Sequence, residues 1–333
     1  MLPIFADPKT DFVFKRIFGA EQRKPLLIAL LNHLLELTGD RRIHDVIHLR
    51  ADQHVDVPEL KLSIVDVKCT DNTGRRFVVE MQVLKVEGFE KRVVYNAAKA
   101  YVMQLRTAEE YPALCDVVGV TICNFNLWSD RDENGAYRVP MLSRWRMFEQ
   151  HCGQAGLGQI QHVFLELPKY AAGDSPVGLI DKWAYFFREA RNLDVIPPAL
   201  TEAPFREAME TARVATFSPE EWDLYDRAKM AEQDARGALV VAREEGLVKG
   251  RAEGRAEGRA EGRAEGRAEG RAQGEAEGRL QAKREVLLRL LSKARLTLSD
   301  AERRMIEDCV DEATLAKWAE NVVGATSVAD VFV

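Results

Sequence analysis

The sequence predicts an α/β domain that is followed by a long helical arm, and three observations lead to this prediction. Two apolar strands surround the turn sequence Asp71-Asn72-Thr73-Gly74, which is a strong signal for an antiparallel hairpin. A segment with helical spacing then separates the hairpin from a dense apolar strand at 115–125, as in a parallel crossover. Finally, glycine recurs at every fourth residue from Gly246 to Gly278, which marks a separate repeat segment.

The spacing of apolar residues predicts the individual elements. Helical spacing over 10–37, broken at Gly19, predicts two helices before a strand at 43–50 and a polar loop that contains Pro58. The later predicted elements are hairpin strands at 60–70 and 75–84, a helix at 89–106, strands at 115–125, 137–147 and 159–167, helices at 176–192 and 203–214, and helix from Pro219 almost to the end.

This order describes a three-stranded sheet, a crossover helix and a returning strand, which is an α/β arrangement. The crossover helix is long enough for a right-handed parallel connection. Shifts in composition divide the chain into a mixed α/β domain at 1–215, a helical arm at 216–285 and a short helical tail at 286–333.

The composition excludes several classes of protein. With 333 residues, 46% of them hydrophobic, the chain has enough apolar material for a core. Its longest wholly apolar run, Leu26 to Leu31, is far shorter than the roughly 20 residues that span a bilayer. The N-terminal residues show no secretory signal, and the five cysteines form no C-x-x-C pair. We therefore expect a cytoplasmic protein.

The charge of the chain neither indicates nor excludes a nucleic-acid partner. The 47 Lys and Arg residues against 53 Asp and Glu residues give a net charge of −6, which argues against a generally basic surface. Residues 1–120, however, hold 17 basic and 17 acidic residues. A local basic surface is compatible with this balance.

Alternation along the hairpin strands predicts the position of two acidic residues. In the first strand we expect Val65 and Val67 on one face, and Asp66 and Lys68 on the other. In the second strand Glu80 stands out as the acidic residue among apolar neighbours.

The turn predicts that Asp66 and Glu80 lie opposite each other. This register results if Gly74 is left-handed at the end of a three-residue loop. Opposed Cβ atoms are about 4.5–5.5 Å apart, and two bare carboxylates at that separation destabilise the sheet. A hard divalent cation such as Mg²⁺ removes this repulsion by binding carboxylate oxygens. Two acids that are simply solvated are the alternative interpretation.

Longer motifs resemble a known nuclease family. Asp66 followed by Glu80-Met81-Gln82 resembles the PD-(D/E)XK motif in its E-x-Q form. The stretch from Asp7 to Gly19 resembles the N-terminal signature of the Rpn family of recombination-promoting nucleases, often labelled PD-(D/E)XK nuclease family transposases, and residues 74–82 and 92–95 fit the same family. The resemblance covers roughly residues 5 to 215. It implies a restriction-endonuclease-like PD-(D/E)XK core, an αβββαβ mixed sheet, before the helical arm.

The resemblance also implies a metal site. Asp66 and Glu80 would bind the ion, with the main-chain carbonyl of Met81 as a third ligand, and Asp11 on the first helix would hold a metal-bound water. Such an ion polarises the scissile phosphate and lowers the pKa of a bound water. Mg²⁺ is the expected metal, with Mn²⁺ and Ca²⁺ as alternatives.

The sequence departs from the usual motif at one position. Gln82 stands where the motif has a lysine, and its neutral amide can orient a water but supplies no positive charge. Lys68, two residues after Asp66, is our candidate for the missing charge. The departure puts the rate and the metal requirement in doubt.

Basic residues near the hairpin are candidate DNA contacts. Lys and Arg contacts to phosphates give a non-specific affinity that falls steeply with salt. A solvated basic surface is the alternative interpretation. The candidates are Lys9, Lys15, Arg16, Arg75, Arg76, Lys85 and Arg92.

Two further groups of residues favour ordinary structural roles. His44 and His48 are about 13 Å apart on an extended strand, at about 3.3 Å per residue, which does not suit one zinc ion. The aromatic residues at 183–187 are expected in the core, with a partner surface as the alternative.

The glycine repeat predicts a helix that is weak on its own. Each four-residue step turns about 400°, so a stripe of equivalent residues drifts about 40° per step. Glycine is about 1 kcal/mol less favourable than alanine in a helix interior, and the Arg and Glu residues each recur at i,i+4, where like charges repel. We expect self-association of the arm, with a flexible spacer as the alternative.

These observations lead to a first hypothesis of a metal-dependent DNA endonuclease that acts in recombination or in the movement of genetic elements. The alternative is a catalytically weak nuclease-like module that binds DNA or protein and self-associates through its helical arm. A third hypothesis is an acidic α/β scaffold without a nucleic-acid partner.

Overall fold

A computed structural model describes residues 3–53, 63–105 and 109–333. The loop expected around Pro58 and the first residues of the strand expected at 60–70 lie outside the described residues. The chain divides into two compact units, Met1–Leu239 and Val240–Val333. The three-part division at 215 and 285 stays a prediction.

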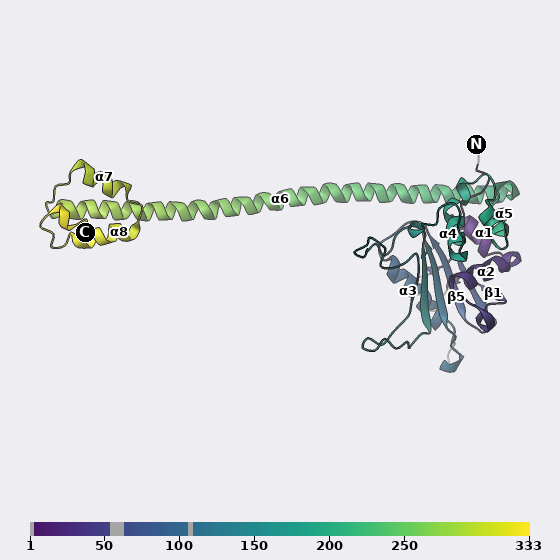
Figure 1. The fold of residues 1–333 in the computed structure, drawn as a ribbon. Helices are drawn as coiled ribbons and strands as arrows, with labels where there is room; N and C mark the ends of the chain where they lie inside the picture. The colour runs from purple at the N-terminus through teal and green to yellow at the C-terminus, as the bar shows by residue number, and fades with distance from the viewer. Residues whose placement is uncertain (1–2, 54–62, 106–108) are drawn as a thin grey trace. The chain divides into compact units, whose positions relative to one another are not determined.

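The first unit is built on a six-stranded mixed sheet (Figure 1). The strands lie in the order β1-β4-β5-β6-β8-β7, and β5, β6 and β8 are parallel while the other pairs are antiparallel. The strands at 142–145 and 160–166 therefore extend the predicted sheet. The bounds are β1 Val46–Leu49, β4 Val67–Asp71, β5 Arg76–Gln82, β6 Val117–Cys123, β7 Leu142–Trp145 and β8 Ile160–Glu166. A separate pair joins β2 Asp52–Gln53 to β3 Ser63–Ile64.

The predicted hairpin register is confirmed. Val67 pairs with Val79 and Thr70 with Arg76, and Gly74 has a φ of 86°. The Asp71 carboxylate closes the loop, since it accepts hydrogen bonds from the backbone N–H groups of residues 73 and 75. A Cβ at Gly74 would also lie 2.6 Å from the Cys115 Sγ atom, so the turn requires glycine in two ways.

Helices cover both faces of the sheet. On one face α1 (Asp11–Phe18), α2 (Lys24–Leu34), α4 (Leu179–Glu189) and α5 (Phe205–Thr211) pack into one large apolar core with Val79 and Val120. On the other face α3 (Phe89–Val102) packs through Ala97 and Ala100 against Val78 and Val117. As predicted, α3 connects two parallel strands, β5 and β6.

Aromatic residues fill the larger core. Trp183, Phe186 and Phe187 are completely buried, which confirms their predicted core role. The Trp183 ring lies 4.8 Å from the ring of Phe205, and its Nε1 donates a hydrogen bond to His33 Nδ1 at 3.0 Å.

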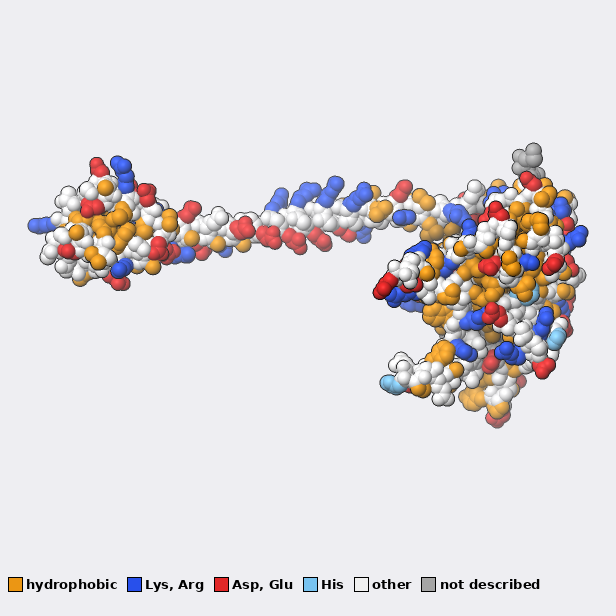
Figure 2. Space-filling model, viewed as in Figure 1, with side chains coloured by type: hydrophobic (Ala, Val, Ile, Leu, Met, Phe, Trp, Pro, Cys, Tyr) orange, Lys and Arg blue, Asp and Glu red, His pale blue; other side chains and the backbone are white. Residues whose placement is uncertain are grey.

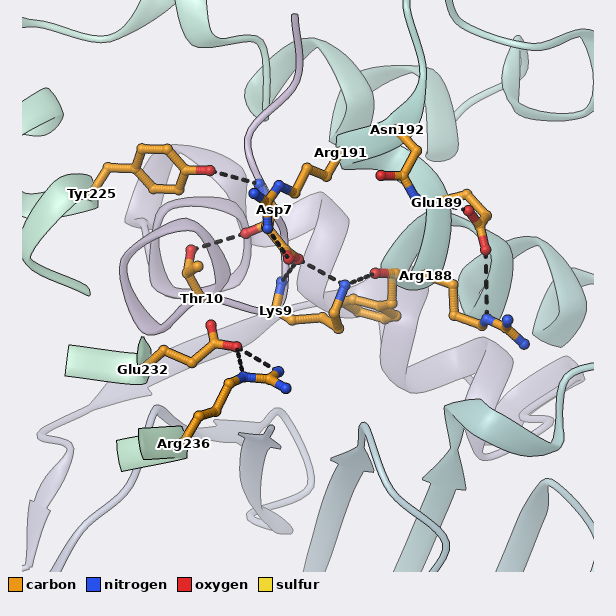
Figure 3. A network of polar contacts seen from close by, with 11 residues as sticks. Asp7, Lys9, Thr10, Arg188, Glu189, Arg191, Asn192, Tyr225, Glu232 and Arg236 are labelled. Carbon is orange, nitrogen blue, oxygen red and sulfur yellow. Dashed lines mark hydrogen bonds and ion pairs between the residues drawn. The ribbon is translucent and has the colours of Figure 1, made fainter. Parts of the chain in front are cut away.

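A polar network fixes the N-terminal segment to α4 and to the start of α6 (Pro219–Lys293), as Figure 3 shows. Lys9 Nζ lies 2.8 Å from Asp7 Oδ1 and donates a hydrogen bond to the Phe187 carbonyl at 2.9 Å. The backbone N–H of Asp7 donates to the Tyr225 hydroxyl. Both charged side chains are largely buried, so the Lys9 ammonium is held inside the protein.

Arg16 is held in a similar way. Its guanidinium forms an ion pair with Glu221, donates to the carbonyls of Thr211 and Thr216, and lies over the Phe217 ring. We therefore leave Lys9 and Arg16 out of the DNA contacts proposed below.

The second unit contains most of α6, then α7 (Asp300–Asp308) and α8 (Glu312–Asn321). Its small core contains Leu287, Leu291, Ile306 and Leu315. Ser299 forms a capping box at the start of α7, which satisfies N–H groups that a helix end leaves unpaired. Among the described residues, no helix is long and apolar enough to cross a membrane.

Candidate active site at the end of strand β5

A cavity of about 790 Å³ lies where β5 ends and α3 begins. Its walls combine three carboxylates, two amides, an ammonium and a guanidinium with the first residues of α3. Its lining includes Asp66, Glu80, Met81, Gln82, Glu87, Arg92 and Asn96. The structure thus brings together Asp66, Glu80, Met81 and Gln82, the four motif residues that the sequence singled out.

Glu80 is a buried carboxylate that is held by one hydrogen bond. It extends from β5 toward α3, where Asn96 Nδ2 donates to its Oε1 at 2.6 Å. Burial raises the pKa of Glu80, while the Asn96 hydrogen bond and the charge of Arg92 lower it in part. Since Oε1 is the atom that accepts from Asn96, Oε2 remains as a second donor atom for a ligand.

Asp66 lies at a bend just before β4. Its Oδ2 accepts a hydrogen bond from the backbone N–H of Met81 at 2.7 Å, next to Glu80 in the chain. Burial raises the pKa of Asp66 to about 7, with the Met81 hydrogen bond acting in the opposite direction. The charges of Asp11 and Glu80 raise this pKa further, and that of Lys15 lowers it.

The first helix therefore contributes charge near Asp66. Sequence reasoning could not place Asp11 in this region, yet its charge acts on Asp66. Asp11 is largely exposed and forms an ion pair with Lys15, with 2.6 Å between Oδ1 and Nζ. Neither residue is among the described residues that line the cavity.

The predicted alternation of side chains before β4 was wrong. Val65 packs with Val78 and Ala97 on the α3 face of the sheet, whereas Val67 packs into the core on the opposite face. The reason is that strand pairing begins only at Val67, so the chain turns at residues 65–66. This bend lets the Asp66 side chain reach the backbone of β5.

Lys68 does not take the position expected for a catalytic cation. It pairs with Val78 in the hairpin, it is buried, and it is absent from the cavity lining formed by the described residues. Its hairpin partner Val78 packs on the α3 face of the sheet.

Arg92 is a cation that lines the cavity and contacts Gln82. Its Nη2 donates to Gln82 Oε1, while Gln82 Nε2 donates to the Leu84 carbonyl at 2.8 Å. Arg92 is exposed toward the cavity and lies 5.5 Å from the centre of the Phe89 ring. A positive charge thus stands directly beside the motif's neutral residue.

Sequence reasoning missed the roles of Arg92 and Asn96 in this arrangement. The available signal was their four-residue spacing, which places both on one face of the crossover helix. The crossover helix comes soon after the E-x-Q strand in the chain, and a crossover helix packs against the sheet that it connects. Residues on its sheet-facing side are therefore expected near the motif.

The other candidate DNA contacts lie in different places. Lys85 donates to the Leu127 carbonyl at 3.4 Å. Arg75 is paired with Asp71, and Arg76 begins β5. Arg76 and Gln82 are six steps apart along the strand, or roughly 20 Å. Arg75 and Arg76 would therefore meet a different part of a nucleic acid from the part that reaches the cavity.

The donor atoms of the cavity suit a hard divalent cation. Across the described residues no group of three or more His, Cys, Asp or Glu side chains that could hold a metal ion is found, and of the three carboxylates in the cavity lining Asp66 and Glu80 are the candidate ligands. Mg²⁺ commonly binds one or two carboxylates and keeps several waters or phosphate oxygens. Burial raises the pKa of Asp66 and of Glu80, and a bound cation would favour the charged form of both carboxylates.

Comparison with known proteins gives one match. A family model described as PD-(D/E)XK nuclease family transposase matches residues 8–242. This range contains every residue of the cavity discussed above. No curated protein and no solved structure matches the chain.

The raised pKa of Asp66 predicts a pH-dependent stability. The folded protein binds this proton more tightly than the unfolded chain, whose Asp titrates near 3.8, so stability falls as the pH rises from about 4 to about 7. In the presence of a chelator, we expect wild type to lose roughly 2 kcal/mol relative to Asp66→Asn between about pH 5 and about pH 8, at ~1.4 kcal/mol per pKa unit. Urea unfolding measures this difference.

The control for this prediction is Asp223→Asn, which removes an exposed carboxylate from a surface ion pair with Arg227. We expect its stability to follow wild type at both pH values. If Asp66→Asn also follows wild type, the raised pKa of Asp66 is contradicted.

Proposed function

Because the chain belongs to the PD-(D/E)XK nuclease family transposases, we propose that it is a divalent-metal-dependent DNA endonuclease that hydrolyses phosphodiester bonds. The observation that carries this proposal is that Asp66 and Glu80 line one cavity at the end of β5. A role in recombination or in the movement of genetic elements rests on the family alone.

We propose that Asp66 and Glu80 hold the cation, with the Met81 carbonyl as a third ligand. Mg²⁺ is the first candidate and Mn²⁺ or Ca²⁺ the alternatives. A bound divalent cation supplies a Lewis acid for the scissile phosphate and lowers the pKa of a coordinated water. Asp11, whose charge acts on Asp66, is proposed as a peripheral acid that orients solvent.

The start of α3 is suited to receive a phosphate. Gly88 and Phe89 line the cavity, and the N-terminal N–H groups of a helix attract anions. Arg92 adds a full positive charge within the same turn. We propose that Lys85 and Lys15 contact neighbouring phosphates, since Lys85 lies three residues after the end of β5 and the charge of Lys15 acts on Asp66.

We propose that Arg92 supplies the positive charge that the usual motif obtains from lysine. Gln82 then serves to position the guanidinium through the hydrogen bond to its Oε1. This arrangement explains how a neutral residue at position 82 is compatible with phosphate chemistry.

One observation favours the second candidate function, a catalytically weak module that binds DNA or protein and self-associates through its helical arm. Both polar atoms of the Gln82 amide already have partners, Arg92 and the Leu84 carbonyl. An amide held in this way is poorly placed to orient a water as well, which would slow hydrolysis.

Cleavage of supercoiled plasmid DNA tests the proposed function. With Mg²⁺ or Mn²⁺ we expect nicked and linear products from wild type, and a loss of at least about 100-fold in rate from Asp66→Ala and from Glu80→Ala, because charge stabilisation by a metal is worth several kcal/mol. Glu87→Gln, which alters another carboxylate of the same cavity, is expected to retain activity.

Equal cleavage by wild type and by both alanine variants would contradict the assignment of the site. Salt-sensitive DNA binding without cleavage in any of these metals would favour the second candidate function instead.

An exchange of charges tests the role of Arg92. We expect Arg92→Ala to lower the cleavage rate about 10- to 100-fold, the effect of losing one charged contact to a phosphate. The double variant Gln82→Lys with Arg92→Ala should recover most of this loss, because the lysine returns a charge to the motif position. Single-turnover cleavage rates measure both effects.

The matched control is Lys91→Ala, which removes a neighbouring cation that also lines the cavity. If Lys91→Ala is as harmful as Arg92→Ala, or if the double variant shows no recovery, the proposed role of Arg92 is contradicted.

A further inference from the structure

The repeat segment of α6 carries four distinct stripes of side chains. Each Gly-Arg-Ala-Glu unit between Gly250 and Gly270 contributes one residue to each stripe. At about 100° per residue, the Arg stripe lies about 100° to one side of the Gly stripe and the Glu stripe about 60° to the other side. Figure 2 shows basic side chains along one side of the arm and acidic side chains along the opposite side.

The described structure leaves these stripes uncovered. A Cβ added at any glycine from Gly246 to Gly278 would meet nothing within 4 Å, and residues 226–275 are almost all exposed. The residues just before the repeat include exposed apolar side chains, among them Leu247 and Val248. The arm therefore presents small, apolar and charged surfaces without a partner in the chain.

A single helix of this sequence is intrinsically poor. Its nine glycines from Gly246 to Gly278 together make it roughly 9 kcal/mol less favourable than an alanine helix. Arg and Glu are two residues apart, so they lie on opposite sides and form no pairs within the helix. A continuous helix over this segment needs stabilisation from outside.

We infer that the partner is a second copy of the same arm, paired in parallel and in register. The seven Arg and seven Glu residues from Arg251 to Arg279 balance each other, which suits an identical helix better than a polyanion such as DNA. Glycine at the contact lets two backbones approach closely, as in other helix pairs with small residues.

Charge complementarity decides the direction of the two helices. When two identical helices face each other through the Gly stripe in parallel, the Arg side of each lies beside the Glu side of the other. This is the same relation that places opposite charges at flanking positions of parallel coiled coils. In an antiparallel pair, Arg would lie beside Arg and Glu beside Glu, and like charges repel.

The repeat length also sets the hand of the pair. A four-residue period exceeds the 3.6 residues of a helical turn, so the Gly stripe drifts in the sense of the helix itself. The two arms must therefore coil around each other with a right-handed twist to keep their Gly stripes in contact.

One interruption of the pattern agrees with facing Arg and Glu stripes. Glu275 replaces an arginine in the Arg stripe, and the nearby position in the Glu stripe holds Gln273 instead of glutamate. Of the two positions in the Glu stripe nearest to Glu275, Gln273 is neutral and Glu277 is negative, so the change at 273 removes one of the two like charges that Glu275 would otherwise face.

The experiment uses the full chain and a variant in which the two stripes exchange places. In this variant the six arginines Arg251, Arg255, Arg259, Arg263, Arg267 and Arg271 become Glu, and the five glutamates Glu253, Glu257, Glu261, Glu265 and Glu269 become Arg. Differently tagged copies are mixed after separate purification, and their association is followed by sedimentation velocity and by co-purification.

The parallel pair predicts that wild type and the exchanged variant each form homodimers, and that mixed dimers are at least about 10-fold rarer than chance. Substitution of the arginines alone should give monomers, because both flanks then become acidic. The circular dichroism of these monomers should still contain the signal of a folded first unit.

Three results would overturn the proposal. In the first, wild type and the exchanged variant are both monomers at micromolar concentration. In the second, mixed dimers are as frequent as homodimers. In the third, mixed dimers are preferred, which antiparallel pairing predicts. Association that appears only after addition of duplex DNA would also contradict it, since DNA would then be the partner of the arm.

Discussion

The pairing of β4 with β5 determines where the candidate site lies. The Asp71 loop and the left-handed Gly74 fix this register, and a shift of one residue would turn Glu80 to the opposite face of the sheet. In the observed register Glu80 extends toward Asn96 on α3, and the backbone N–H of Met81 meets the Asp66 carboxylate. The turn thus controls the position of both acids, although it is far from the cavity.

The fold holds both acids in a buried place that disfavours their charged forms. Burial raises both pKa values, and the hydrogen bonds from Asn96 and Met81 offset only part of this effect. Desolvated groups with perturbed pKa values in a cavity are typical of functional sites. A divalent cation would favour their charged forms and would explain why the fold buries these side chains.

The sequence allowed prediction of the features that depend on local patterns. The loop at 72–74, the hairpin register and the burial of Trp183 and Phe187 all follow from turn chemistry and apolar spacing. The resemblance to a nuclease family, noted from the motifs around Asp66 and Glu80, agrees with the family that matches residues 8–242.

Features that depend on distant contacts could not be predicted in this way. The bend at residues 65–66 results from the end of strand pairing, which alternation does not reveal. Lys9 appeared as a free cation because its partner, the Phe187 carbonyl, is far away in the chain. Arg92 was considered only as a DNA contact, since its hydrogen bond to Gln82 requires α3 to pack beside the end of β5.

The most direct test of the central claim is the binding of Mn²⁺ to the full chain above pH 7, followed by the electron paramagnetic resonance signal of the free ion. The account predicts Mn²⁺ binding by wild type that is lost in Asp66→Asn and in Glu80→Gln but kept in Glu90→Gln, an exposed acid on α3. Mn²⁺ binding that is unchanged in both Asp66→Asn and Glu80→Gln would contradict the claim that these two carboxylates share one cation.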